Sequence, residues 1–399
     1  MSGIRKKNRI YLFLLLLVAL FLVLKVIRGT TITDEQGGIW NIIQVLFVGM
    51  GIYILFSNNR SYRSVNVIRY YLLFFIYIWI LAFFPFITAY RIGVNEWFHF
   101  LTIPYGVMVV LTFYSVGGKA DLKQYSWVLW FCFVIISILF FRGMQSFRLD
   151  AIRSGSTSDV YYIVGLLPII LINTVKKYKI VPLLIAFSCI LMSNKRGAFF
   201  ILGALMIIYY VMPDVTKKKA NNLFGRLLLV SIVLAASYFF MILMTSLYDF
   251  NMLNRMEQIE EDGGSGRWDR WVYLMTMLFG SKSVVRLFFG YGRGAACDFT
   301  GGHAHNDFVE FLFDYGVIAL ILYIVFYVAM IKEGVSMYKH GYLYTREYFC
   351  TVAIAIGMSL YSFYAIDCTW ITSSSVCFGL LLADWNKYKS NGYQYTYSK

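Results

Sequence analysis

Long apolar segments recur along the whole chain, separated by short polar stretches. A helix needs about 20 mostly apolar residues to cross a bilayer. We predict twelve membrane-spanning helices, at residues 10–27, 40–56, 70–90, 97–116, 126–141, 159–175, 180–193, 197–213, 227–246, 316–331, 348–366 and 371–385. The composition agrees, because 59% of the residues are hydrophobic and only 14% are charged, whereas soluble domains are about 25% charged. The sequence therefore predicts an all-α, polytopic transmembrane helical bundle.

The basic residues give these predicted helices an orientation. Short cytoplasmic loops of membrane proteins carry an excess of Lys and Arg. Most of the 36 Lys and Arg residues share one side of the membrane if the N-terminus is cytoplasmic, whereas the opposite loop at 30–38 contains acids and no Lys or Arg. We therefore expect a multi-pass protein of the cytoplasmic (inner) membrane with both termini in the cytoplasm. Topology also explains the net charge of +15, so we expect the lipid bilayer, and no nucleic acid, as a partner.

One long segment interrupts the apolar pattern. It divides the chain into residues 1–246 with spans one to nine, an extracytoplasmic loop at 247–315, and residues 316–399 with spans ten to twelve and a cytoplasmic tail. We expect this large loop to carry the chemistry of the protein, because it concentrates glycine, carboxylates and two of the four histidines.

Local patterns predict structure inside the loop. Residues 271–279 are apolar but too short and too closely flanked by charge to span a membrane, which indicates an amphipathic helix at the interface. Glycines near 263–266, 290–294 and 301–302 predict turns.

The end of the loop predicts a second helix. Asn306 or Asp307 can cap a helix that begins there. The spacing of three acids puts them on one face of it, and four apolar side chains take the other: Asp307, Glu310 and Asp314 against Phe308, Phe311, Leu312 and Tyr315.

His303 and His305 lie two residues apart between glycines and carboxylates. A neutral imidazole can accept a proton from a sugar hydroxyl, which is general base catalysis. A metal site with Asp298 and Asp307 is a second interpretation, and an interfacial cap without chemistry is a third. The spacing of the two histidines leaves all three open.

Arginines on the predicted outer side run against the usual topology and need an explanation. Guanidinium groups suit two-point contact with phosphate oxygens. Arg196 lies between two spans with almost no loop, which favours a functional role. For three others we favour plain surface charge: Arg142, Arg148 and Arg286.

The six cysteines form no Cys-x-x-Cys pair. Four fall in apolar segments, where we expect them to pack as small hydrophobic residues: Cys132, Cys189, Cys350 and Cys377. Cys297 and Cys368 fall in predicted outer loops, where a disulfide between them is one option.

Three local patterns in the C-terminal half resemble those of the O-antigen polymerase and O-antigen ligase superfamily (Wzy/WaaL-type integral membrane proteins). The first is the polar turn at residues 193–197, which contains Arg196. The second is the Gly-Arg-Trp-Asp-Arg-Trp run at residues 266–271. The third joins Gly290-Tyr291-Gly292 to His303-Ala304-His305-Asn306 and then to Gly316. The match covers about residues 192–330 and departs from the family pattern at Lys195, where serine often precedes the arginine.

The resemblance implies glycan transfer at the extracytoplasmic face. The donor would be a glycan on undecaprenyl pyrophosphate, and the acceptor the next lipid-linked repeat unit in a polymerase or lipid A core in a ligase. It implies no metal or cofactor. It also implies chain-length regulator and flippase proteins as further candidate partners.

The resemblance also implies residue roles. His305 would be the catalytic base, and Arg196 and Arg267 would be catalytic ligands of the pyrophosphate. Substrate-binding roles fall to four residues: His303, Arg270, Asn306 and, on the loosest match, Arg153.

Two alternatives stay open. One is an O-antigen ligase or protein O-oligosaccharyltransferase of the same superfamily. The other is a non-enzymatic exporter or flippase, which would carry charged residues inside its spans. The predicted spans are nearly free of charge, which favours the enzyme.

Overall fold

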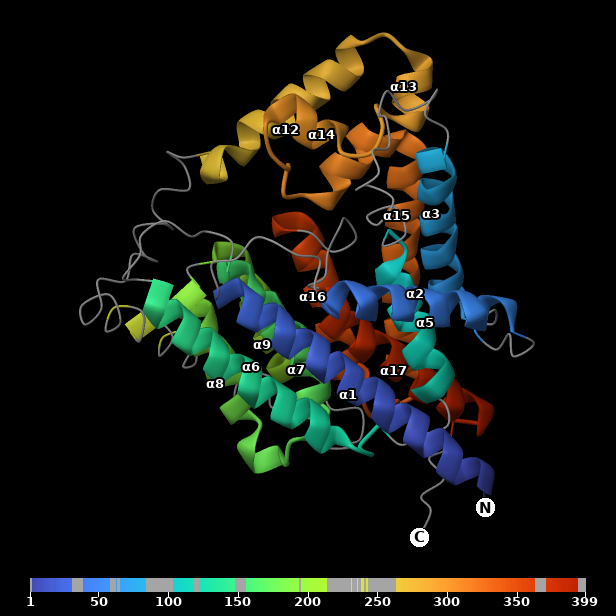
Figure 1. Ribbon diagram of the computed structural model, residues 1–399, viewed down its shortest axis with the longest axis vertical. Helices are drawn as coiled ribbons and strands as arrows, with labels where there is room; N and C mark the ends of the chain where they lie inside the picture. Colours follow the sequence, from blue (N-terminus) through green and yellow to red (C-terminus); the bar gives the residue numbers. More distant parts are fainter. Residues whose placement is uncertain are drawn as a thin grey trace.

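The computed structural model describes residues 2–30, 39–57, 62, 65–83, 103–117, 122–147, 156–193, 195–213, 263–362 and 371–393, with a few isolated residues between 231 and 242. Every regular element over these residues is a helix and none is a strand, as the sequence predicts. Figure 1 shows the helices gathered in one bundle, with α12, α13 and α14 at the end opposite to the start of α1.

The first half of the chain contributes both outer and buried helices of the bundle. Its helices are α1 (Ser2–Thr30), α2 (Ile39–Phe56), α3 (Asn66–Phe83), α5 (Tyr105–Gly117), α6 (Ser126–Phe147), α7 (Val160–Asn173), α8 (Ile180–Ser193) and α9 (Arg196–Val211), with 3-10 turns η2 (Ser156–Asp159) and η3 (Lys176–Tyr178). The second half contributes α12 (Gly263–Gly280), α13 (Val284–Phe289), α14 (Ala295–Thr300), α15 (Asp307–Lys339), α16 (Thr345–Tyr361) and α17 (Ile371–Ser390). Every predicted span overlaps one of these helices, except 227–246, which falls almost entirely outside the described residues. Parts of 70–90, 97–116 and 348–366 also lie outside them.

Three helices of the described chain are long and apolar enough to cross a membrane: Arg9–Ile27 in α1, Trp127–Met144 in α6, and α15. Shorter apolar helices surround them, among them α2, α3, α5, α7 and α9. Length and composition thus support membrane association of the bundle. The count of twelve crossings stays a prediction.

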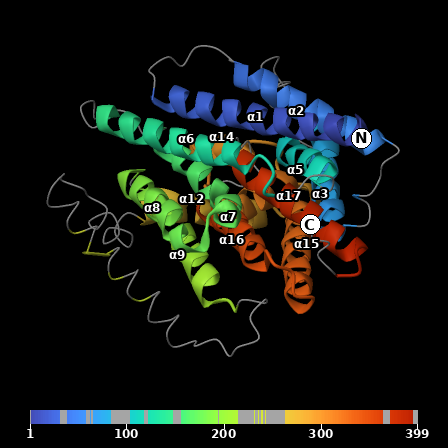
Figure 2. The same ribbon diagram turned by 90° about the horizontal axis from the view of Figure 1, so that it is seen from below.

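The helices are layered. Seen from below, α1 and α2 lie on one side, followed inward by α6 and α5 and then by α7 and α17 (Figure 2). Small residues allow this close packing, as they do in membrane helix pairs. A Cβ atom on Gly379 of α17 would lie 2.6 Å from the carbonyl oxygen of Val110 in α5, so glycine is required at this contact.

Helix α15 runs through the core. Aromatic rings join it to α3, where Tyr71 stacks on Phe326 with ring centroids 4.2 Å apart and Phe74 meets Phe311 at 4.7 Å. At the far end of α15, Glu333 accepts hydrogen bonds from Trp385 and Lys389 of α17. The ends of α15 and α17 therefore lie together, and Figure 1 shows them at the same end of the bundle as the start of α1.

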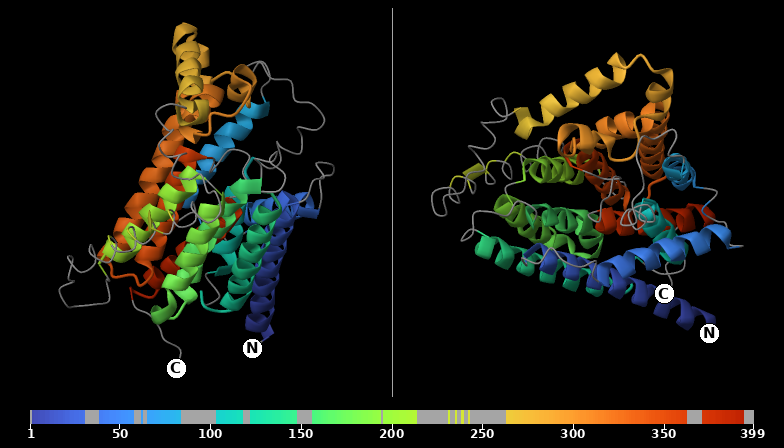
Figure 3. Two further views of the ribbon diagram at one scale, coloured as in Figure 1. Left: turned by 90° about the vertical axis from the view of Figure 1, so that its left-hand side faces the viewer. Right: turned by 45° about the horizontal axis from the view of Figure 1, so that its top comes forward.

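The predicted loop at 247–315 is largely helical where the structure describes it. Helix α12 covers the predicted amphipathic segment, runs obliquely over the end of the bundle (Figure 3, right) and buries Leu274 and Leu278 in a small second core with α14 and α15. Its other side exposes Trp268, Val272 and Phe279. All three predicted glycine turns contain positive φ, at Gly266, Gly290, Gly292, Gly294 and Gly301, although Gly266 lies within the bounds of α12.

The predicted boundary at residue 316 lies inside α15. The helix begins at Asp307, and the Asn306 side chain caps it by accepting hydrogen bonds from the backbone N–H groups of Phe308 and Val309, at 3.0 and 3.2 Å. This confirms the predicted cap. Gly316 has φ 79° and ψ −176°, so the helix breaks there and resumes directly. The chain therefore kinks sharply at Gly316, where two helical segments meet.

Candidate functional site

The glycine-rich turn at residues 290–294 is built around one carboxylate. Asp314 of α15 is buried, and its two oxygens accept hydrogen bonds from the backbone N–H groups of Gly294 and Ala296, both at 2.8 Å. The Asp314 carbonyl also accepts from the N–H of Gly292 at 2.8 Å. Positive φ at the glycines allows the backbone to close around the charge. The carboxylate therefore fixes the turn to α15.

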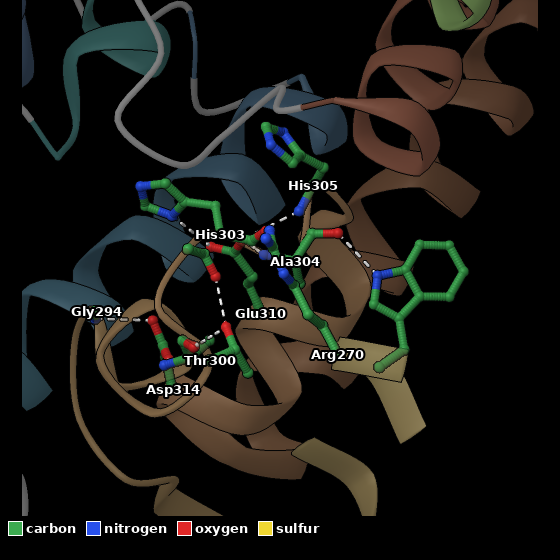
Figure 4. A network of polar contacts seen from close by, with 11 residues as sticks. Arg270, Gly294, Thr300, His303, Ala304, His305, Glu310 and Asp314 are labelled. Carbon is green, nitrogen blue, oxygen red and sulfur yellow. Dashed lines mark hydrogen bonds and ion pairs between the residues drawn. The ribbon is translucent and has the colours of Figure 1, made fainter. Parts of the chain in front are cut away.

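A second buried carboxylate holds the histidine segment (Figure 4). Glu310 is 1% exposed, and its Oε1 accepts from the backbone N–H groups of Ala304 at 2.6 Å and His305 at 3.3 Å. Its Oε2 lies 3.4 Å from Nδ1 of His303. One side chain on α15 thus contacts all three residues of the His-Ala-His run.

Helix α12 holds the same segment from the other side. Arg270 donates through Nη1 to the carbonyl of His303 at 3.0 Å, and the Trp271 indole donates to the carbonyl of Ala304 at 2.8 Å. The N–H groups of the segment face α15 and two of its carbonyls face α12. Its backbone is therefore fixed from both sides, as a site built to position side chains requires.

The polar turn at residues 193–197 and the run at residues 266–271 both reach the C-terminal end of α16, which also contacts Asn306. Arg267 donates through Nη1 to the carbonyl of Tyr361 at 2.9 Å, and Asn306 donates through Nδ2 to the carbonyl of Leu360 at 3.4 Å. Gly197 of α9 packs directly on Tyr361, where an added Cβ would lie 2.8 Å from the Tyr361 Cβ. Residues around 197, 267 and 306, far apart in the sequence, therefore meet around one helix end.

The positions of the remaining predicted residues differ. Arg196 is the first residue of α9 and directly precedes Gly197, as the predicted tight turn requires. Arg153 and Arg148 lie outside the described residues. Arg142 is exposed on α6, and Arg286 lies over the ring of Tyr291 at 4.5 Å, so neither belongs to the group at the end of α16.

His305 occupies an unusual environment. Its backbone is left-handed, with φ 54°, a conformation that is uncommon for residues other than glycine and that clusters at functional sites. Burial, together with the positive charges of Arg267, Lys195, His303 and Arg270, lowers the pKa of His305 from its ordinary value of 6.5 to about 3. The ring is therefore neutral at physiological pH.

Asp307 does not join the histidines, in contrast to the metal interpretation. Its Oδ2 accepts hydrogen bonds from Tyr323 at 2.8 Å and Ser359 at 3.1 Å, inside the bundle. Across the described residues, no three His, Cys, Asp or Glu side chains come together in an arrangement that could hold a metal ion.

Cys297 is a free thiol in α14. The disulfide option therefore finds no support at Cys297, and Cys368 lies outside the described residues.

Sequence reasoning missed several parts of this site. The acids at 307, 310 and 314 were visible as a helical pattern, but their separate partners depend on tertiary structure. The sequence marks Lys195 only as a departure from the family pattern, but in the structure its positive charge lowers the pKa of His305. No sequence signal marks the backbone carbonyls of Leu360 and Tyr361.

No model of a known protein family matches this chain, and no curated protein is significantly similar to it. The family resemblance therefore rests on the local patterns alone.

Proposed function

We propose that this protein is a membrane glycosyltransferase that polymerises polysaccharide repeat units, such as O-antigen, capsule or exopolysaccharide. The glycan would pass from undecaprenyl pyrophosphate to a sugar hydroxyl of the next lipid-linked unit. The observation that carries the proposal is the meeting of Arg267, Asn306 and the turn before Gly197 around the end of α16. Arginines near a neutral histidine suit an anionic leaving group and a hydroxyl nucleophile.

The reaction needs two kinds of help. The bond between the anomeric carbon and the phosphate oxygen breaks, and its electron pair leaves with the pyrophosphate. The acceptor oxygen bonds to the same carbon and loses its proton. In our proposal His305 accepts that proton, and Arg196 and Arg267 neutralise the leaving pyrophosphate. Each such contact contributes about 2–4 kcal/mol to lowering the barrier, by comparison with oxyanion donors.

The surroundings of His305 suggest how donor and base cooperate. A ring with a pKa near 3 is a weak base, and general bases work best with a pKa near the operating pH. Part of the depression comes from Arg267, Lys195 and Arg270. A bound pyrophosphate would offset those charges, so donor binding would make His305 more basic when the acceptor must be activated.

The chain's architecture supports an outer-face site. Helices α12 to α14 lie at the end of the bundle opposite to the start of α1 (Figure 1). We propose twelve crossings of the cytoplasmic membrane with both termini in the cytoplasm, which would put the histidine segment at the outer surface. A flippase that delivers lipid-linked units and a chain-length regulator would then be its partners.

A deletion strain tests the proposal. Its lipid-linked glycans, and those of the complemented strain, are extracted and sized by mass spectrometry. We expect single repeat units on the lipid carrier in the deletion strain and long polymer after complementation. Long polymer that accumulates on the carrier would instead indicate the ligase or protein O-oligosaccharyltransferase alternative. A wild-type glycan profile in the deletion strain would contradict the proposal.

A further inference from the structure

The two histidines of the site have different surroundings. The His303 side chain is 44% exposed, whereas the side chain of Glu310 is 2% exposed. Oε2 of Glu310 lies 3.4 Å from Nδ1 of His303. His305 contacts the same carboxylate through its backbone N–H, at 3.3 Å, and its ring points away from Glu310 (Figure 4). The pair formed by Glu310 and His303 is therefore distinct from the environment of the His305 ring.

The hydrogen bonds of Glu310 indicate which nitrogen of the His303 ring carries a proton. Oε1 of Glu310 accepts hydrogen bonds from two backbone N–H groups, those of Ala304 and His305. Oε2 faces Nδ1 of His303, and a carboxylate oxygen can only accept a hydrogen bond, so Nδ1 carries the proton. Nε2 then lies on the other side of a half-exposed ring.

A nearby carboxylate also favours the positively charged ring. Other charged or titratable groups surround the pair on three elements: Arg270 on α12, Cys297 and Asp298 on α14, and Asp314 on α15, with His305 beside it in the segment. Arg270 contacts His303 at its carbonyl oxygen, whereas Glu310 lies beside the ring. The Glu310 carboxylate therefore contacts the imidazole ring of His303 itself.

We propose that His303, held by Glu310, is a second functional imidazole that contacts the leaving pyrophosphate through Nε2–H, while His305 handles the acceptor proton. Glu310 acts as a positioning residue, because it fixes the proton on Nδ1 and compensates the charge of the ring. The inference rests on the proposed function and divides its reaction between the two histidines. Two titratable groups whose environments push their protonation apart commonly take opposite proton roles in one site.

Binding of inorganic pyrophosphate tests this division. The purified full-length protein in lipid nanodiscs is titrated calorimetrically, as wild type and as His303→Gln, Glu310→Gln, Glu310→Ala, His305→Gln and Arg267→Gln. We expect wild type to bind, and His303→Gln and Glu310→Gln to bind about tenfold more weakly, the size of one charge-assisted hydrogen bond. His305→Gln should bind like wild type. Asp269→Asn, which removes an exposed carboxylate from α12, is the matched control and should also bind like wild type.

The variant Glu310→Gln distinguishes a role in positioning the His303 ring from a role in holding the backbone of the segment. Its carbonyl oxygen still accepts from Ala304, but its amide N–H₂ cannot accept from Nδ1 of His303. In protein labelled with ¹⁵N-histidine, we expect the Nδ1-protonated signal of His303, assigned with His303→Gln, to be present in wild type and lost in Glu310→Gln. Wild-type affinity and an unchanged signal in Glu310→Gln, with weak binding only in Glu310→Ala, would overturn the inference.

Two further outcomes distinguish the inference from the proposed function. If Arg267→Gln weakens pyrophosphate binding but His303→Gln and Glu310→Gln do not, the inference fails and the pyrophosphate site stands. If wild type binds no pyrophosphate, the proposed function loses its anion site and the inference fails with it.

Discussion

Gly316 and Phe288 lie in direct backbone contact, where the break in α15 meets α13. A Cβ atom on Gly316 would lie 2.2 Å from the carbonyl oxygen of Phe288. A second backbone contact between the same two segments is equally close: a Cβ on Gly290 would lie 2.3 Å from the carbonyl of Asp314. Both glycines have positive φ, 79° and 78°. Two glycines thus join the end of α13 to the turn of α15 that carries the carboxylates of the site.

Replacing either glycine with alanine should therefore destabilise the protein. The new methyl group would meet backbone atoms that cannot rotate away, and positive φ adds strain, so we expect a loss of about 2 kcal/mol or more for Gly316→Ala or Gly290→Ala. Thermal unfolding of the purified protein measures this. Gly203→Ala is the control, because a Cβ there meets nothing within 4 Å, in a helix where alanine is favoured. Equal unfolding temperatures for Gly316→Ala and Gly203→Ala would contradict the expectation.

Asp314→Asn should weaken the glycine turn. The buried carboxylate accepts from Gly294 and Ala296 at 2.8 Å each. An amide keeps one accepting oxygen and presents N–H₂ to the other backbone N–H, so one buried backbone N–H loses its hydrogen bond at a cost of about 1–3 kcal/mol. The unfolding temperature should fall. Asp269→Asn on the exposed side of α12 should leave it unchanged, and a similar drop in both variants would argue against a special role for Asp314.

The sequence was sufficient for much of the fold, because long apolar segments inside a bilayer satisfy their backbone hydrogen bonds most simply as helices. The cap at Asn306 was also predictable, since its signal is local. The helical character of 263–300 was predicted only at residues 271–279. Helices α13 and α14 are six residues each. Ser283 caps α13 by accepting a hydrogen bond from the backbone N–H of Arg286, and glycines with positive φ end both helices; in the sequence these glycines predict only turns.

The site was predictable in residue type but not in architecture. His305 and Arg267 follow from the local patterns, and the structure brings them into electrostatic contact. The role of Glu310 in holding residues 303–305 was not predictable from the sequence. These residues lie in a turn that is also held by α12, and that contact depends on tertiary structure. The helical spacing of the acids placed them on one face without showing that each binds a different backbone segment.

Acid should destabilise the protein through His305. Its pKa is lowered to about 3 in the folded state and is near 6.5 when unfolded. Between these values the unfolded state binds the extra proton, so this contribution to stability is present above pH 6.5 and is lost as the pH falls toward 3. We expect the unfolding temperature of wild type to fall more steeply between pH 7 and pH 4 than that of His305→Gln. Parallel curves would show that the ring is not held neutral.

Arg267→Gln should impair polymer formation while the protein still reaches the membrane. If Arg267 contacts the leaving pyrophosphate, its loss should slow transfer about 10²–10³-fold, by comparison with removal of an oxyanion donor. Because Arg267 also binds the carbonyl of Tyr361, the unfolding temperature of the variant must be measured alongside polymer length on a gel. Arg142→Gln, which removes an exposed charge on α6, should give wild-type polymer. Full-length polymer from Arg267→Gln would exclude an essential contact.

The most direct measurement concerns His305 itself. The deletion strain is complemented with wild type or His305→Ala, both are shown to reach the membrane in equal amounts, and polysaccharide length is compared on a gel. We predict long polymer with wild type and only single repeat units with His305→Ala, because the acceptor hydroxyl would lose its base. Long polymer of wild-type distribution from His305→Ala would contradict the role of His305 in glycan transfer.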